Sequence, residues 1–210
     1  MSRSLLVTGA AGFIGANFVY HWSETYPEDT IVAFDALTYA GNRTSLATLE
    51  AGKRAHFVQA NICDATAVAQ AIEHFEVDTI VHFAAESHVD RSITGPDAFI
   101  ETNIVGTHTL LAAARNAWLT GSGKPHRFHH VSTDEVFGSL SKEAPAFTED
   151  LRYEPNSPYS ASKAASDHLV RAYHHTYGLN VTTSNCSNNY GPFHFPEKLI
   201  PLCLTNILDG

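Results

Sequence analysis

Residues 5–15 read LLVTGAAGFIG, and this stretch sets the fold expected for the rest of the chain. Its first part is a short apolar run ending at Thr8, which predicts a buried strand. Gly9, Gly12 and Gly15 follow at a GxxGxxG spacing and open a helical pattern. Glycines at such a turn let the backbone approach a phosphate group, which the free N–H groups of the helix start can bind. The stretch favours a dinucleotide-binding turn, although glycines in a strand-to-helix turn also occur for packing alone.

The rest of the chain alternates short apolar runs with longer helical patterns. We expect strands at residues 5–8, 30–35, 56–59, 79–83, 127–132 and 181–185. We expect helices at about residues 13–23, 43–50, 65–74, 96–118 and 158–177, the second being the weakest. Strands that are apolar throughout and alternate with helices are typical of a parallel sheet covered on both faces. The predicted fold class is therefore α/β, a Rossmann-type doubly wound parallel sheet with helices on both faces.

Local signals mark the ends of several of these helices. Asp64 is placed to cap the helix that follows it, and Ser157 precedes a proline at the first helical position. Gly178 follows the last residue of the 158–177 pattern, where a helix commonly ends. Residues 138–156 carry mixed charges and two prolines, and we expect a surface loop there.

Composition and charge limit the classes of function. The 210 residues include 44% hydrophobic and 17% charged ones, which is ordinary for a globular protein and enough for one well-buried domain and the start of a second. The net charge of -9 argues against nucleic acid as the main partner. No apolar run is long enough to span a membrane, and no signal peptide is evident, so a cytoplasmic protein is expected.

Cysteine and histidine usage gives no sign of a disulfide framework or a metal centre. Cys63, Cys186 and Cys203 are few and scattered, so we expect three reduced thiols. The 13 histidines lack the spacing of metal ligands, and we predict no metal.

The carboxylate of Asp35 stands where a dinucleotide-binding fold places an acid. It ends the second predicted strand, 20 residues after Gly15, where a carboxylate accepts hydrogen bonds from the adenosine ribose. No arginine follows before Arg43 to balance a 2′-phosphate, so we predict NAD rather than NADP. The alternative is that Asp35 only terminates a strand.

A tyrosine and a lysine are paired in the helix expected at 158–177. Tyr159 and Lys163 are four residues apart and therefore share one face of the helix. A neighbouring ammonium and a nicotinium ring both favour the phenolate, so we expect Tyr159 to take a proton from a substrate hydroxyl while hydride leaves the same carbon. In isolation such a pair is common on a helix surface.

Two adjacent carboxylates end the strand expected at 127–132. Thr133, Asp134 and Glu135 follow it directly, and in a doubly wound sheet ligands bind beyond the carboxyl ends of the strands. Such acids are costly at a buried strand end without a use. The alternative is that they cap a helix or loop, but Tyr159 and Lys163 should reach the same crevice.

Five motifs together resemble those of one family. They are TGAAGFIG (8–15), AAESHVDRSITGP (84–96), STDEVFG (132–138), SPYSASKAASDHLVRAY (157–173) and NCSNNYGPFHFPEKLIP (185–201). They resemble the dTDP-glucose 4,6-dehydratase family of extended short-chain dehydrogenases, and the resemblance runs from Leu5 to about Gly210. The first motif and the Tyr/Lys spacing are generic to the superfamily. The Asp-Glu pair and the last motif are more specific.

The resemblance implies a dehydration of dTDP-glucose to dTDP-4-keto-6-deoxyglucose with no net change in the cofactor. NAD would take hydride from carbon 4 of the sugar while Tyr159 removes the hydroxyl proton. Glu135 would then remove a proton from carbon 5, and Asp134 would protonate the departing hydroxyl of carbon 6. Hydride would return to carbon 6, so that water is lost overall.

The resemblance also implies which residues bind. Catalytic roles fall to Thr133, Asp134, Glu135, Tyr159 and Lys163, and Thr133 also contacts the substrate. Further substrate contacts fall to Ser87, Asn188 and Lys198. The NAD site would comprise Gly9, Gly12, Phe13, Ile14, Gly15, Asp35, Leu37, Thr38, Asn61, Ile62, Ala84, Ala85, Thr102, Tyr159, Lys163 and Asn189.

The expected organisation is an NAD-binding domain at residues 1–185 and the beginning of the sugar-nucleotide-binding region at 186–210. Relatives continue well past the position of Gly210, so most of the C-terminal substrate domain is expected to be missing here. The resemblance further implies a homodimer built on the helices at 96–118 and 158–177. Two alternatives stay open: a nucleotide-sugar 4-epimerase, which needs no acid–base pair at carbons 5 and 6, and an inactive NAD-binding fragment.

Overall fold

The computed structural model describes residues 2–209, so Met1 and Gly210, the outermost residues of the two expected regions, lie outside the described residues. A six-stranded parallel sheet forms its centre, in the order β3-β2-β1-β4-β5-β6. Its strands are β1 (Ser4–Thr8), β2 (Thr30–Asp35), β3 (His56–Gln59), β4 (Thr79–His82), β5 (Arg127–Thr133) and β6 (Val181–Cys186). The prediction of a doubly wound parallel sheet is confirmed.

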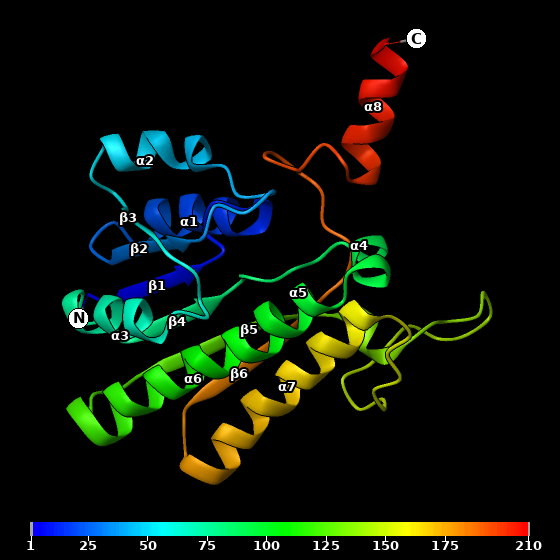
Figure 1. Cartoon of the computed structure of the whole chain (residues 1–210). Helices are drawn as coiled ribbons and strands as arrows, with labels where there is room; N and C mark the ends of the chain where they lie inside the picture. Colours follow the sequence, from blue (N-terminus) through cyan, green and yellow to red (C-terminus); the bar gives the residue numbers. More distant parts are fainter. Residues whose placement is uncertain (1, 210) are drawn as a thin grey trace.

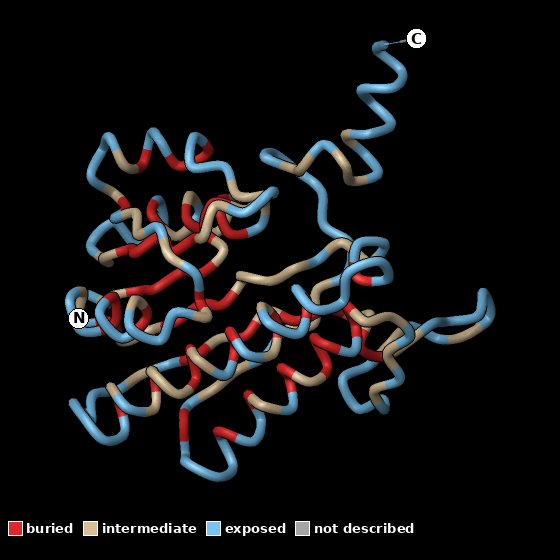
Figure 2. Tube along the Cα trace, in the orientation of Figure 1, coloured by how far each residue is buried: buried red, intermediate tan, exposed pale blue. Residues whose placement is uncertain are grey.

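Helices cover both faces of the sheet (Figure 1). One face carries α1 (Phe13–Thr25) and α2 (Ala47–Ala51), and the other carries α3 (Ala65–His74), α6 (Thr107–Arg115) and α7 (Pro158–Tyr177). A hydrophobic core lies on each face of the sheet, and the side chains of β1 point alternately into the two. Leu5 and Val7 pack in the core that contains residues of α1, and Leu6 packs in the core that contains residues of α3, α6 and α7. All three are fully buried, as expected for a central strand. Figure 2 shows the buried residues concentrated along the strands and on the inward faces of the helices.

The helix expected at 96–118 is longer and less regular than predicted. It runs through α5 (Asp97–Phe99), a π-helical segment at Ile100–Gly106, α6, and a second π-helical segment at Asn116–Ser122. The weak prediction at 43–50 corresponds to a 3-10 turn, Arg43–Leu46, followed by α2.

Two helices are present that the sequence pattern did not predict. They are α4 (Val89–Thr94), which is a single short turn beyond the end of β4, and α8 (Leu199–Asp209). None of the residues of α8 is buried (Figure 2).

The predicted helix ends are confirmed. Asp64 accepts hydrogen bonds from the N–H groups of Thr66 and Ala67, both at 3.0 Å. Ser157 forms a reciprocal capping box with Ser160 at the start of α7. Gly178 ends α7 in the left-handed conformation, at a φ of 77°.

Residues 138–156 form the expected loop, which projects from the sheet (Figure 1). Its far end returns to the body, where Tyr153 packs edge-on against Phe137 at a ring distance of 5.2 Å. Cys63, Cys186 and Cys203 are free thiols. Within residues 2–209, no helix combines the length and the apolar character needed to cross a membrane.

Candidate active site

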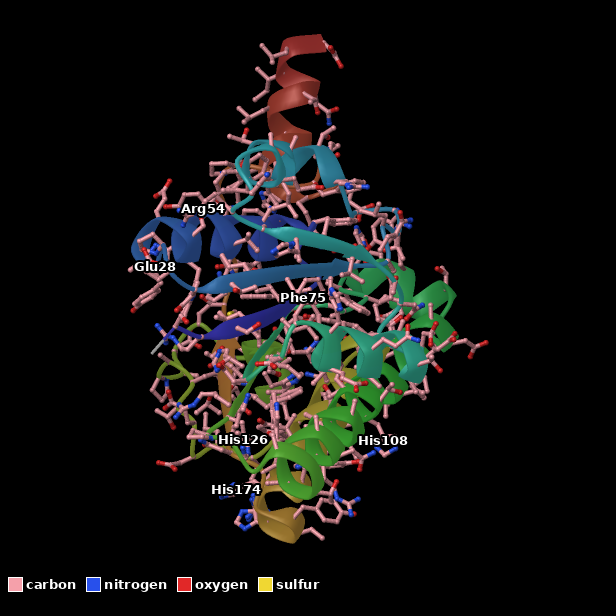
Figure 3. All side chains as sticks on the ribbon, turned by 90° about the vertical axis from the view of Figure 1, so that its left-hand side faces the viewer. Glu28, Arg54, Phe75, His108, His126 and His174 are labelled. Carbon is pink, nitrogen blue, oxygen red and sulfur yellow. The ribbon has the colours of Figure 1, made fainter. Side chains whose placement is uncertain are left out.

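A groove of about 350 Å³ lies beyond the carboxyl ends of the strands. The order of the strands reverses between β1 and β4, and this is where doubly wound sheets bind their ligands. The opposite end of the sheet, where the strands begin, is the end toward the viewer in Figure 3, with Arg54 and His126 among its labelled residues. All the predicted site residues except Leu37 line the groove, namely Gly9, Gly12, Phe13, Ile14, Gly15, Asp35, Thr38, Asn61, Ile62, Ala84, Ala85, Ser87, Thr102, Thr133, Asp134, Glu135, Tyr159, Lys163, Asn188, Asn189 and Lys198.

The glycine turn packs too tightly for side chains. Gly9 has a φ of 67°, and a Cβ there would lie 2.6 Å from the backbone nitrogen of Ala84. A Cβ on Gly15 would lie 2.1 Å from the carbonyl oxygen of Gly9. Helix α1 begins after Gly12, and its first turn, Phe13-Ile14-Gly15-Ala16, carries no acid. The positive end of this helix is therefore open to an anionic ligand.

Asp35 is held rigidly at the end of β2. Its Oδ2 accepts a hydrogen bond from the N–H of Ala11 at 2.9 Å, and its Oδ1 accepts one from Leu37 at 2.8 Å. Burial raises the pKa of the Asp35 carboxyl, and the two backbone bonds oppose that rise. Each oxygen keeps a second lone pair for a ligand hydroxyl.

Leu37 differs from its expected placement. It packs against the core cluster around Leu5 and Val7, and it adopts a positive φ of 53°. Its contribution to the site is the N–H that orients Asp35.

Tyr159 and Lys163 are both buried in the first turns of α7. The Lys163 ammonium donates a hydrogen bond to the carbonyl oxygen of Val131 at 2.9 Å. Burial lowers the pKa of Lys163 to about 8. The lysine therefore stays largely charged at neutral pH.

In the protein without a cofactor, the Tyr159 phenol stays protonated at neutral pH. Burial raises the pKa of the Tyr159 phenol well above its usual value, and the nearby carboxyl of Glu135 raises it further. Hydrogen bonding with Thr133 opposes this rise. Burial and the negative charge of Glu135 outweigh the effect of that hydrogen bond.

The two acids occupy a 3-10 turn, Asp134–Phe137, that continues directly from β5. The N–H of Glu135 donates to the hydroxyl of Thr133 at 3.2 Å, which fixes the start of this turn. Burial raises the pKa of the Glu135 carboxyl, Asp134 raises it further, and Lys198 lowers it. The structure thus brings the acids, Tyr159 and Lys198 to one groove.

Several groove residues were missed by the sequence reasoning. They include Gly41, Cys186, His194 and Phe195. The segment after β6 folds back over the start of α1, where the ring of His194 lies 4.5 Å from that of Phe13. No periodic pattern marks this segment, so only the HFPEKLIP run that carries the resemblance could have indicated it.

A contact that we call the Arg91 bridge joins three segments at the rim of the groove. It consists of Tyr39, Arg91 and Glu197. The Arg91 guanidinium pairs with Glu197 at 2.8 Å and lies 3.9 Å from the centre of the Tyr39 ring. His88 lies beside this bridge, with its Nε2 atom 3.9 Å from the Glu197 carboxylate.

Comparison with known proteins identifies the family. The GDP-mannose 4,6 dehydratase family model matches residues 6–210. The chain is 57% identical to dTDP-glucose 4,6-dehydratase 1 of Escherichia coli (strain K12), over 98% of this chain and 60% of that protein. It also resembles the crystal structure of dTDP-glucose 4,6-dehydratase from Streptomyces venezuelae with NAD bound, with a TM-score of 0.91, 53% identity, and coverage of 99% of this chain and 63% of that one.

A more distant likeness links the chain to an epimerase. The structure of UDP-glucuronic acid 4-epimerase from Bacillus cereus, in complex with UDP-glucuronic acid and NAD, matches with a TM-score of 0.88 and 26% identity, over 99% of this chain and 63% of that one. The chain spans about 60% of the length of the curated relatives it matches. From the family match and the groove together, we conclude that the chain belongs to the GDP-mannose 4,6 dehydratase family.

Proposed function

We propose that this chain carries the NAD-binding and catalytic part of an enzyme that dehydrates dTDP-glucose to dTDP-4-keto-6-deoxyglucose. One observation carries the proposal: Asp134 and Glu135 line the same groove as Tyr159 and Lys163. A 4-epimerase needs the tyrosine but no acid–base pair at carbons 5 and 6. The relatives named dTDP-glucose 4,6-dehydratase, at more than 50% identity, support this choice.

The residues of the groove fit NAD. The open start of α1 suits a pyrophosphate, and the glycines leave no side chain to block it. The Asp35 carboxylate suits the two hydroxyl groups of an adenosine ribose, whereas a 2′-phosphate would meet its negative charge. When bound, the nicotinamide accepts a hydride from the substrate and later returns it. We assign an NAD-binding domain, which holds all the residues of this site except Asn189, to the region 1–185, and the start of the sugar-nucleotide-binding region to 186–210.

Tyr159 would take the proton from the sugar's carbon 4 hydroxyl. Its raised pKa means that the phenol is protonated in the protein alone, so it needs help to act as a base. The Lys163 ammonium and the positive charge of the oxidised nicotinamide both favour the phenolate. Thr133, which hydrogen-bonds Tyr159, would hold the same substrate oxygen.

Glu135 and Asp134 would divide the elimination between them. Because the pKa of Glu135 is raised toward neutral pH, its carboxylate is a stronger base toward the carbon 5 proton. Asp134 would protonate the carbon 6 hydroxyl as it leaves. Ser87, Asn188 and Lys198 would bind the nucleotide part of the substrate, with the Lys198 ammonium suited to the diphosphate.

The experiment mixes the chain with NAD and dTDP-glucose and identifies the products by NMR and mass spectrometry. The expected result is the loss of one water with formation of a 4-keto-6-deoxy sugar. Formation of the carbon 4 epimer would instead establish the epimerase. Binding of NAD without binding of dTDP-glucose would show a cofactor-binding fragment, and the same assay then applies to a longer protein containing this chain.

A Glu135→Gln variant tests the assignment of the base. The amide keeps the size of the side chain but cannot take a proton, so dehydration should fall by about 10²-fold or more. Glu73→Gln, an exposed change on α3, is the matched control and should leave the rate unchanged. Undiminished dehydration by the Glu135→Gln variant would refute this role.

We also infer that the protein pairs with a second copy through its long helices. Ile100, Val105 and Leu119 on the 97–122 helix and Tyr177 on α7 expose large apolar side chains. Helices α6 and α7 pack side by side, so these residues belong to neighbouring helices. Sedimentation equilibrium should give twice the chain mass, and an Ile100→Glu/Val105→Glu variant should sediment as a single chain.

A further inference from the structure

A buried carboxyl, Asp167, lies behind the catalytic pair. It stands on α7 four residues after Lys163, so the two side chains lie one helical turn apart on the same side. It is 6% exposed and does not line the groove. A buried carboxylate is costly unless its charge is balanced or used. The proposed chemistry gives Asp167 no contact with substrate, so its place requires another explanation.

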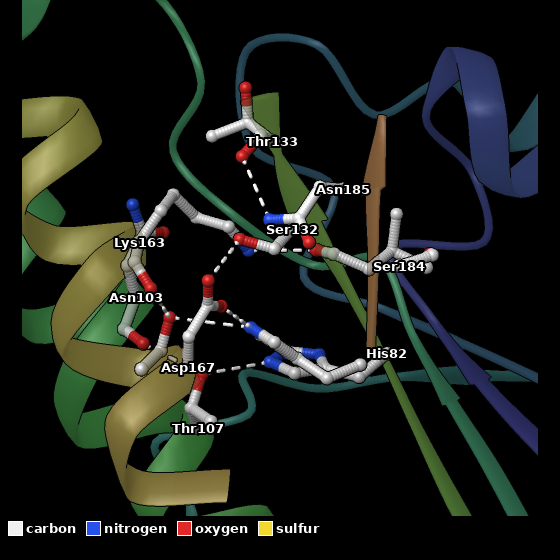
Figure 4. Close-up of polar contacts among 12 residues, drawn as sticks. His82, Asn103, Thr107, Ser132, Thr133, Lys163, Asp167, Ser184 and Asn185 are labelled. Carbon is white, nitrogen blue, oxygen red and sulfur yellow. Dashed lines mark hydrogen bonds and ion pairs between the residues drawn. The ribbon is translucent and has the colours of Figure 1, made fainter. Parts of the chain in front are cut away.

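Asp167 fixes the strand end that receives the lysine (Figure 4). Its Oδ2 accepts a hydrogen bond from the Ser132 hydroxyl at 2.8 Å. The residue before Ser132 is Val131, whose carbonyl oxygen accepts the hydrogen bond from Lys163. One carboxylate oxygen therefore ties α7 to the part of β5 on which the ammonium rests.

The same oxygen anchors the projecting loop. The Tyr153 hydroxyl donates to Oδ2 at 3.0 Å, and the Tyr153 ring packs on Phe137 in the turn that carries the two acids. The Oδ2 atom thus accepts two hydrogen bonds, one from β5 and one from the loop.

The charge of Asp167 is not cancelled by its other neighbour. The Nε2 of His130 approaches Oδ1 to 3.0 Å, but Oδ1 lacks a well-aligned hydrogen bond. His130 is fully buried, and burial lowers its pKa well below the usual value. The ring is therefore neutral, and the negative charge of Asp167 remains available to Lys163.

The influence between Asp167 and Lys163 is mutual. Burial lowers the pKa of Lys163, and Asp167 is the strongest influence in the opposite direction. Burial raises the pKa of Asp167, while Ser132, Lys163 and Tyr153 oppose the rise.

We propose that Asp167 is a positioning residue, which keeps Lys163 protonated and seated on the Val131 carbonyl so that the ammonium can support the Tyr159 phenolate. The role in phenolate formation rests on the proposed function. The effect on the lysine itself is a property of this chain alone.

The other groups around Lys163 do not replace Asp167. The titratable groups whose charges interact with this lysine are Asp167 on α7, His82 on β4, His130 on β5 and Cys186 on β6. Tyr159, Asp134 and Glu135 line the same groove as Lys163. Both histidines are kept neutral by burial, and burial raises the pKa of the Cys186 thiol.

The test is an NMR titration of lysine side chains in the chain without ligand. The sequence has five lysines, Lys53, Lys124, Lys142, Lys163 and Lys198, so their labelled ¹³Cε signals can be resolved, and Lys163→Arg assigns the signal of interest. In the unmodified chain this signal should titrate near pH 8.

The decisive variant is Asp167→Asn. Its amide oxygen can still accept from Ser132 and Tyr153, but the charge is gone, so the midpoint of Lys163 should fall by about one pH unit. Asp167→Glu should restore it, and Glu73→Gln, which removes an exposed charge on α3, should leave it unchanged. An unchanged midpoint in Asp167→Asn overturns the proposal, as does an equal fall in Asp167→Glu.

If the Asp167→Asn variant does not fold, the titration of the unmodified chain still tests the proposal. A Lys163 signal that is already neutral at pH 7 in the unmodified chain would then overturn the proposal. Because the titration needs no cofactor or sugar, a correct result for Lys163 together with no dehydration would reject the proposed function and leave the positioning role standing.

Discussion

At the scale of single residues, Asp35 shows how one side chain can be both structural and functional. Its two oxygens receive two separate backbone N–H groups, from Ala11 and Leu37, and the same oxygens face the groove. This arrangement requires two acceptors, so it distinguishes a carboxylate from the amide of the same shape.

Asp35→Asn should therefore weaken both the fold and the site. An amide has one acceptor oxygen, so one N–H group would face an NH₂ and lose its hydrogen bond, at a cost of about 1–3 kcal/mol in the free energy of unfolding. The affinity for NAD should fall by about tenfold. Urea unfolding and calorimetric titration measure the two effects. The exposed Asp150→Asn is the control, and equal effects from both changes would contradict the argument.

At the scale of elements, the long helix at residues 97–122 supports the loop after β4. The buried amide of Asn103 accepts a hydrogen bond from the N–H of Glu86 at 2.9 Å and donates to the carbonyl of Glu86 at 3.0 Å. It also donates to the Ser162 hydroxyl on α7 at 2.8 Å. A single side chain thus joins two helices to the loop that contains Ala84, Ala85 and Ser87.

Asn103→Ala should lower the free energy of unfolding by about 2–4 kcal/mol, because it leaves the half-buried backbone N–H and carbonyl of Glu86 without these hydrogen bonds and opens a small cavity. Chemical unfolding measures this loss. Asn116→Ala lies on the same long helix at an exposed position and should cost less than about 0.5 kcal/mol. Similar losses for the two variants would show that Asn103 does not hold the loop.

Most of the helices and strands, but not all, could be predicted from the sequence alone. The strands and the helices α1, α3 and α7 were predictable because local signals agreed: apolar runs, the cap at Asp64, the capping box at Ser157 and the stop at Gly178. The π-helical segments were not predictable, because no local pattern indicates them. At the end of the first segment, Gly106 lies so close to Ile62 that an added Cβ would be 2.5 Å from its Cδ1 atom, a contact that only the structure reveals.

Some features of the candidate site could likewise be predicted from the sequence, and others could not. The glycine turn and Asp35 could be inferred from their spacing, and the position of the acids could be inferred from the end of β5. The rise in the pKa of Tyr159 could not, since it depends on burial and on charges brought together by the fold. The contact of His194 with Phe13 joins residues far apart in the sequence and likewise required the structure.

At the scale of the whole molecule, buried histidines make stability depend on pH. His82 and His130 are fully buried in the core between the sheet and its helices, and burial lowers the pKa of both well below the usual value. Below about pH 6.5 these two histidines bind protons in the unfolded chain but stay neutral in the folded chain. Stability from these residues is therefore present above that pH and is lost as the pH falls.

The free energy of unfolding should decrease between pH 7 and pH 5.5, by up to about 1.4 kcal/mol per pH unit for each histidine. Carboxyls with raised pKa values, such as Asp35 and Asp167, act in the opposite direction, so the comparison with His82→Gln isolates the histidine contribution. Urea unfolding at several pH values should give a shallower slope for that variant. An unchanged slope would contradict the neutral state assigned to His82.

The Arg91 bridge connects parts of the molecule that approach the groove from different sides. Arg91→Met should speed the release of NAD, on the order of threefold, because the bridge is partly exposed and such pairs add little. Stopped-flow fluorescence of NADH release measures the rate. Lys124→Met breaks an exposed ion pair with Glu76 away from the groove and should have no effect. Equal release rates in the two variants would show that the bridge does not retain the cofactor.

The projecting loop at 138–156 has a consequence for proteolysis. Lys142 is exposed near its tip, whereas Tyr153 is anchored to Asp167, so trypsin should cut the native chain first at the tip. The two fragments would each keep one of the paired strands β5 and β6, which match from Phe128 with Val181 to Thr133 with Cys186. A nicked molecule should therefore migrate as one species under native conditions and separate into two pieces only in denaturant.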